Sequence, residues 1–165
     1  MRTNAQCSPT QSGFTLVEAA VVVAVLTVLV SVAAPSMGNL MLDSRVKQAS
    51  LDLYSAMTYA RSEAIARDAN VSVSAAGTWS SGWKVTVGTA TLKQTGPLSN
   101  ITVTGPADNT LTYKPNGRLA VSSPVTFTFS APGNGGVTMR CVSSTLSGRP
   151  VLQVDRNRDG DCTNG

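Results

Sequence analysis

The sequence predicts an α+β fold in which one long N-terminal helix packs on a C-terminal head of antiparallel β-sheet. An apolar run over residues 14–34 is followed by an amphipathic pattern with steps of three and four residues up to about Arg67. Beyond Asn70, apolar residues alternate with polar ones, which is typical of strands with one buried face. The 165 residues suffice for one such head and leave no room for a second large domain.

The composition argues against an enzyme. The 13 Lys and Arg exceed the 9 Asp and Glu by only four charges, which is below the density typical of polyanion-binding proteins. The chain has no His, so the commonest general base and the commonest metal ligand are missing. It also lacks a Gly-x-Ser-x-Gly elbow and a phosphate-binding loop. We therefore expect a structural or interaction role, without catalysis and without a cofactor.

The first half of the predicted helix is a membrane-span candidate. Residues 14–34 contain one charge, Glu18, and about twenty apolar residues suffice to cross a bilayer. The segment before the run is polar, and its small-residue break, Gly13, precedes the run, whereas a secretory signal is cleaved after it. A plain single-pass anchor remains an alternative, although it leaves the polar leader unexplained.

The junction Gly13-Phe14-Thr15-Leu16-Val17-Glu18 closely resembles the prepilin peptidase site of type IV pilins and type II secretion pseudopilins. The resemblance implies that the peptidase cuts after Gly13 and that the new N-terminal Phe14 is N-methylated. It also implies that Glu18 pairs with the N-terminal amine of a neighbouring subunit, since a carboxylate in a bilayer needs a partner. A Glu18 that snorkels to the interface is the alternative. Pro35 stands where many pilins carry a helix-kinking proline.

The cysteines fit this processing. The precursor has three, and cleavage after Gly13 would discard Cys7. Cys141 and Cys162 would then remain as a pair that an oxidising periplasm can join. A bridge that closes a loop of this size contributes about 3 kcal/mol of stability.

The second half of the predicted helix is half-exposed. One face carries apolar residues at helical spacing, and we expect this face to lie against the sheet. The charged residues between them are expected to be solvated. The apolar face comprises Leu42, Val46, Ala49, Leu53, Ala56, Ala60 and Ala64.

Strands are expected at residues 71–73, 84–87, 101–103 and 125–129, joined as a meander. Glycine and proline mark the expected turns between them. These turns are placed at Gly77, Gly82, Gly96-Pro97, Gly105-Pro106, Pro115-Asn116-Gly117, Pro132-Gly133 and Gly135-Gly136.

Three sequence elements are similar to those of one branch of the pilin family, the GspH/FimT minor pilins. They are Ala60-Arg61-Ser62-Glu63-Ala64-Ile65, Trp79-Ser80-Ser81-Gly82-Trp83 and Asn116-Gly117-Arg118-Leu119. The resemblance implies the type IV pilin fold. Each element also has a purely structural interpretation, which we favour: Arg61 and Glu63 as surface charges, Trp83 as core and Asn116-Gly117 as a hairpin turn.

The tail contains a candidate DNA-binding surface. Some FimT-type pilins carry a Gly-Arg-x-Arg tail motif implicated in DNA binding during transformation, and here Gly148-Arg149 matches its start while Val151 replaces the second arginine. Arg140, Arg156 and Arg158 are candidates to join Arg149 in binding double-stranded DNA without sequence specificity. The alternative is a scattering of surface arginines whose charge Asp155, Asp159 and Asp161 partly cancel.

The stretch from Asp155 to Asp161 also resembles the opening of an EF-hand loop, with oxygen ligands at alternate positions and Gly160 at the sixth. Two arginines interrupt the acids, and the glutamate expected at the twelfth position is missing. We therefore expect a polar turn and no metal.

Together these features divide the chain into a cleaved leader (1–13), a transmembrane and filament-core helix (14–34), its amphipathic continuation (35–69) and a β-rich head with a disulfide-closed tail (70–165). The resemblance implies a minor type IV pilin, first in the inner membrane with its head in the periplasm and then in a surface filament with other pilin subunits. A type II secretion pseudopilin of the GspH kind is the alternative, and a DNA receptor is a third reading.

Overall fold

The computed structural model describes residues 13–133 and 135–162, except for the side chains of residues 32–36. The helix α1 (Leu16–Arg67) precedes the strands of the head. The strands are β1 (Val71–Ala76), β2 (Thr78–Val87), β3 (Ala90–Thr95), β4 (Thr102–Thr104), β5 (Thr110–Tyr113), β6 (Val125–Ser130), β7 (Arg140–Ser144) and β8 (Pro150–Val154).

The chain divides into two compact units, the first ending at Met37 and the second beginning at Gly38, and α1 contributes residues to both. In the first unit α1 begins with a side-chain cap. The Thr15 hydroxyl accepts a hydrogen bond from the Glu18 N–H at 3.2 Å, which satisfies one of the free amides of the first turn. The helix ends after Arg67, where Asp68 adopts the left-handed conformation common just past helix C-termini.

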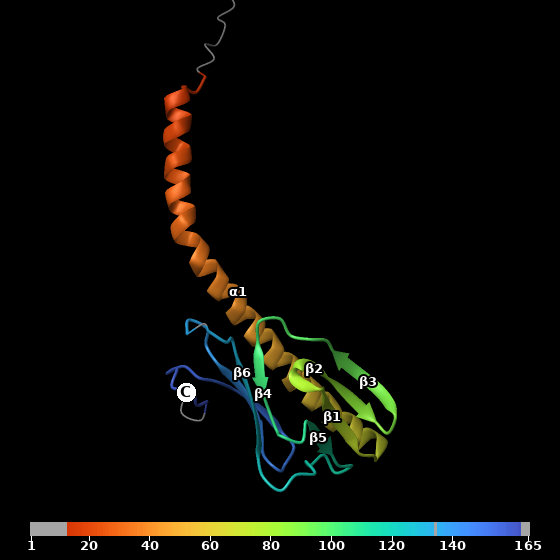
Figure 1. Ribbon diagram of the computed structural model, residues 1–165. Coiled ribbons are helices and arrows are strands. Elements are labelled where there is room, and N and C mark those ends of the chain that lie inside the picture. The colour runs from red at the N-terminus through yellow and green to blue at the C-terminus, as the bar shows by residue number, and fades with distance from the viewer. Residues whose placement is uncertain (1–12, 134, 163–165) are drawn as a thin grey trace, which may run out of the picture. The chain divides into compact units, whose positions relative to one another are not determined.

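In the second unit α1 contributes one face to the core of the head (Figure 1). Six of the seven residues of the predicted apolar face are buried, and Leu42 is half-buried. Met57, at 0% exposure, joins them although the predicted stripe omitted it. The expected amphipathic helix is therefore confirmed, and its small alanines allow the sheets to approach closely.

The head contains two four-stranded antiparallel sheets, with strand orders β3-β2-β1-β5 and β4-β6-β7-β8. The two are joined at β2 and β4, where the Val103 N–H donates to the Ser80 hydroxyl at 2.9 Å. Beside this junction Trp79 and Phe127 pack edge to face, with ring centroids 4.7 Å apart. Gly105 is required there, because a Cβ would come within 2.7 Å of the Phe127 ring.

The α+β class is confirmed, but the strands do not form the expected meander. β5 returns to pair with β1, and β4 leaves the first sheet to pair with β6. The expectation of a turn at Gly82 was also wrong. Gly82 lies inside β2 with φ of +95°, and a Cβ there would overlap the carbonyl oxygen of Thr95.

Candidate functional site

The predicted processing site lies at the start of the described chain. Gly13 and Phe14 are both exposed, with Phe14 at 83% exposure. Glu18 is exposed in the first turn of α1. Residues 1–12 of the predicted leader, Cys7 included, lie outside the described residues. Thr15 and Glu18 also follow the Thr-x-x-Glu pattern of a helix capping box, which is a local sequence signal for the start of this helix.

The first unit exposes a large apolar surface. Val17, Leu26 and Leu29 are each more than half exposed, as are most of the valines between them. In the part of the chain that the structure describes, no helix is both long enough and apolar enough to cross a membrane. The span over residues 14–34 therefore stays a prediction. The side chain of Pro35 lies outside those described, so the predicted helix kink stays a prediction as well.

The turn at residues 114–118 brings two of the family-like elements together. The Lys114 N–H donates to the Arg118 carbonyl at 2.9 Å, and Gly117 adopts φ of +72°, so the predicted hairpin turn is confirmed. Arg61 of α1 donates its Nε–H to the Gly117 carbonyl at 3.0 Å. The interpretation of Arg61 as a solvated surface charge was therefore wrong. Glu63, by contrast, pairs with Arg67 one turn later on the helix.

The loop at residues 145–149 packs against the same turn. The Leu119 N–H donates to the Leu146 carbonyl at 3.2 Å. Gly148 is buried with φ of +76°, and a Cβ there would overlap the Gly117 carbonyl oxygen. A carbonyl of the turn thus occupies the space that a side chain at position 148 would fill. The glycine of the predicted tail motif is required by packing and by backbone conformation together.

Tyr113 forms the floor beneath this contact. Its side chain is fully buried, and its hydroxyl has no hydrogen-bond partner among the described residues. Burial raises the pKa of the Tyr113 hydroxyl, and the nearby Arg61 guanidinium opposes this shift. Trp83 is likewise buried, at 1% exposure, which confirms its interpretation as core.

Arg149 is exposed next to Gly148 and lines a groove of about 360 Å³ between α1 and β8. The remaining lining is mostly apolar, with Leu51 and Val151 exposed at 38% and 48%. The groove therefore combines a mostly apolar lining with one cation. This lining suits the binding of an anionic or amphipathic ligand more than it suits catalysis.

Arg140 does not belong to an open cationic surface. Its guanidinium lies 3.7 Å from the Asp43 carboxylate of α1, and its side chain is only 15% exposed. The Nε of Arg140 is buried without a partner among the described residues. Arg140 therefore joins β7 to the helix, and its inclusion in the DNA-binding patch finds no support in this geometry.

The tail loop is held at two points. Cys141 and Cys162 form a disulfide. Asp155, at 2% exposure, accepts hydrogen bonds from the backbone N–H groups of Arg158 at 2.7 Å and Gly160 at 3.0 Å. These bonds shape the loop that carries the exposed Arg156 and Arg158.

The EF-hand-like stretch is this same loop. The Asp155 carboxylate serves backbone amides, as in an Asx turn, so it is not presented to a cation. Within residues 13–133 and 135–162, no group of three or more Cys, Asp or Glu could hold a metal ion.

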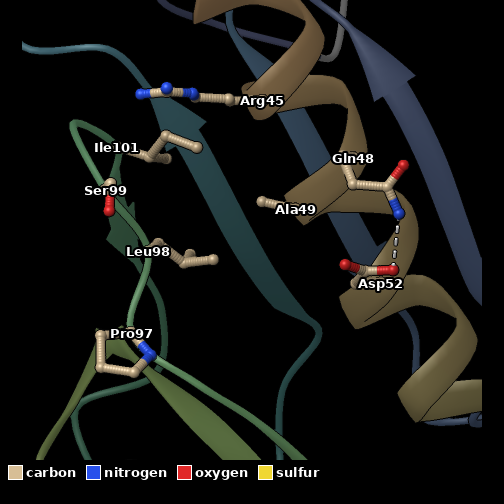
Figure 2. A pocket seen from close by; sticks show the side chains of 8 residues that line it. All are labelled: Arg45, Gln48, Ala49, Asp52, Pro97, Leu98, Ser99 and Ile101. Carbon is tan, nitrogen blue, oxygen red and sulfur yellow. Dashed lines mark hydrogen bonds between the residues drawn. The ribbon is translucent and has the colours of Figure 1, made fainter.

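A second groove, of about 330 Å³, lies between α1 and the segment 97–101 (Figure 2). Leu98 and Ile101 point from this segment toward Ala49 of α1, and Arg45 extends across one end. At the other end the Gln48 amide donates to the Asp52 carboxylate at 2.9 Å. Its rim has charges of both signs, and its floor is apolar.

Comparisons with known proteins agree with this architecture. Residues 49–148 match the family model of the type II transport protein GspH, and residues 8–34 match the prokaryotic N-terminal methylation motif. A comparison with curated proteins found no match.

Two crystal structures of the type IV minor pilin FimU of Pseudomonas aeruginosa are similar in fold. One is 24% identical with a TM-score of 0.58, and covers 67% of this chain and 97% of that chain. The other, from a second crystal form, is 23% identical with a TM-score of 0.60, and covers 68% and 94%. Since the GspH model spans more than half of the chain and the methylation motif precedes it, the chain belongs to the GspH family of type IV pilin-like proteins.

Proposed function

We propose that this chain is a minor subunit of a type IV pilus that contributes to pilus biogenesis and function. The observation that carries the proposal is the succession of a methylation motif and a GspH head on one chain. In this proposal the subunit is held in the inner membrane by residues 14–34 with its head in the periplasm, and then moves into a filament at the cell surface.

The proposal includes processing by a prepilin peptidase between Gly13 and Phe14, followed by N-methylation of Phe14. The methylation motif at residues 8–34 and the exposure of both residues support it. The intact mass of the protein from its native membrane tests it, with an expected N-terminus of methylated Phe14. A mass that retains Met1, or that corresponds to a cut beyond Ala34, contradicts it.

Assembly with other pilin subunits follows from the apolar first unit. Its exposed valines and leucines need apolar surroundings, which a membrane or a bundle of like helices supplies. Glu18 needs a partner in either setting. We propose that the amine of a neighbouring subunit's Phe14 pairs with Glu18 on assembly. A Glu18→Gln variant should then be processed normally and fail to enter filaments, as scored by immunoblot of sheared pili.

For the head we propose a contact with double-stranded DNA, without sequence specificity, through Arg149 and with Arg156 and Arg158 as accessory cations. The exposure of all three supports this. In a strain that carries Arg149→Ala, loss of transformation with normal pilus number supports the DNA contact. Loss of piliation indicates an assembly role instead.

A type II secretion pseudopilin is the second candidate, favoured by the match to a model described as a type II transport protein. A deletion strain separates the two candidates. Electron microscopy should show fewer or no pili, with secretion intact, if the chain is a minor pilin. A secretion defect with normal pili identifies the pseudopilin.

A further inference from the structure

The turn 114–118 and the loop 145–149 form one packed unit although they are distant in sequence. Leu119 donates to Leu146, and the Gly117 carbonyl fits against Gly148. Both glycines are buried and both have positive φ. These backbone contacts hold the two segments together. They therefore also set the relative positions of the backbone atoms that carry the cationic side chains.

Three exposed cations surround this contact. Lys114 and Arg118 face each other across the turn, joined by the backbone bond between them. Their neighbours Tyr113 and Leu119 form a β-bridge and are buried, so alternation places Lys114 and Arg118 on the outer face. Arg149 directly follows the buried Gly148 and is exposed.

These three cations take no part in the ion pairs of the head. Among the described residues, the ion pairs are Arg67 with Glu63 and Arg140 with Asp43. Arg156 and Arg158 lie in a loop that also carries two aspartates, Asp159 and Asp161. Lys114, Arg118 and Arg149 thus form a group of exposed cations, joined by the contact between turn and loop, that has no acid partner among the described residues; other exposed cations such as Lys47 and Lys84 are also outside the two ion pairs but do not adjoin this contact.

We propose that Lys114, Arg118 and Arg149 form a single phosphate-binding surface that contacts the phosphodiester backbone of duplex DNA. This inference rests on the proposed DNA contact of the head and extends it from the tail motif to the hairpin turn. Val151 replaces the second arginine of the tail motif. Lys114 and Arg118 supply the positive charge that is lost with that arginine. Phosphates accept such contacts in any base sequence, so binding is salt-dependent and unspecific.

Arg61 is a positioning residue for this surface. Its Nε–H bond to the Gly117 carbonyl reaches across 56 residues of sequence and fixes the turn on α1. The Arg61 side chain is partly buried, and it bonds the same Gly117 carbonyl oxygen that fits against Gly148. Losing the bond should displace the Lys114 and Arg118 pair without removing any of the three charges.

The test measures binding of the full chain, solubilised in detergent, to a fluorescent DNA duplex by anisotropy over a range of salt concentrations. The variants are Arg149→Gln and the double variant Lys114→Gln with Arg118→Gln. The matched control is Lys47→Gln with Lys84→Gln, which removes the same charge from exposed positions elsewhere. The double variant should bind more weakly, and its slope of log affinity against log salt should fall by about 1.8, since each lost phosphate contact accounts for about 0.9.

The outcomes separate this inference from the proposed function. If Arg149→Gln weakens binding while the turn variant behaves as the Lys47 and Lys84 control does, the surface inference is overturned and the DNA contact of the tail stands. If the parent chain shows no binding at low salt, the DNA contact itself fails.

For Arg61, the Arg61→Met variant should weaken binding at a temperature at which circular dichroism shows a folded head. Arg61→Lys, which keeps a donor, should restore most of that binding. Equal binding by parent and Arg61→Met overturns the positioning role.

Discussion

Replacing Gly148 by alanine tests the contact between the turn and the loop. The new Cβ would overlap the Gly117 carbonyl oxygen and lie 3.1 Å from the Tyr113 ring. The Gly117 carbonyl is part of the backbone and the Tyr113 ring is at 0% exposure, so neither group can move away easily. Alanine in the left-handed region costs about 1–2 kcal/mol, and overpacking adds about 1–3 kcal/mol. We expect Gly148→Ala to lower the free energy of unfolding by about 2–5 kcal/mol.

Gly133→Ala provides the matched control. Gly133 has φ of +73° against +76° at Gly148, and a Cβ there would meet nothing within 4 Å. It therefore incurs only the conformational cost of about 1–2 kcal/mol. The difference between the two variants isolates the steric overlap.

The assay is denaturant unfolding of the full chain in detergent, followed by tryptophan fluorescence, because Trp79 and Trp83 are buried at 3% and 1% exposure. Equal midpoints and slopes for Gly148→Ala and Gly133→Ala would refute the packing argument.

Three further perturbations test the core and the tail. Because burial raises the pKa of Tyr113 above its ordinary value of about 10, the unfolded chain releases this proton first. The corresponding stability is present below the unfolded-state pKa and is lost as the pH rises from that value through the folded-state pKa. Tyr113→Phe should reduce the steepness of that loss above pH 10 without destabilising the head at pH 7; an unchanged pH dependence argues against it. Replacing Cys141 and Cys162 together by serine should lower the free energy of unfolding by about 3 kcal/mol, and reduction of the parent chain should reproduce that midpoint. Asp155→Asn should cost about 1–3 kcal/mol in the same assay, whereas Asp108→Asn at an exposed position should change it by less than about 0.5 kcal/mol.

The helix and the strands β1, β2, β4 and β6 were predictable because their periodicity is imposed by the core, whereas β5 and β7 were missed. The stripe from Val46 to Ala64 repeats at helical spacing, and in β6 buried residues alternate with exposed or half-buried ones. β3 was missed because it lies at a sheet edge and is largely exposed, so no core face marks its sequence. β8 begins with Pro150, which sheets accept at an edge but which reads as a breaker in sequence.

The candidate site was predictable only in part. Gly148 and Arg149 were recognised from a local motif, and the turn at Gly117 from its residue types. Their meeting with Arg61 depends on contacts between segments separated by tens of residues, which local patterns do not encode. For the same reason the strand order could not be predicted. Alternation of apolar and polar residues identifies a strand, but it does not identify the strand with which it pairs. The pairing of Arg140 with Asp43 is likewise a tertiary event.

The carboxylate of Asp155 bears on whether the tail loop takes its shape before or after the disulfide forms. Its bonds to the amides of Arg158 and Gly160 require no oxidant, so the loop can close while both thiols are still reduced. Cys162 lies two residues beyond the second of these bonds, and Cys141 lies in the neighbouring strand β7. The hydrogen bonds of Asp155 thus bring Cys162 close to Cys141, and oxidation then links the two sulfurs without a change in the loop.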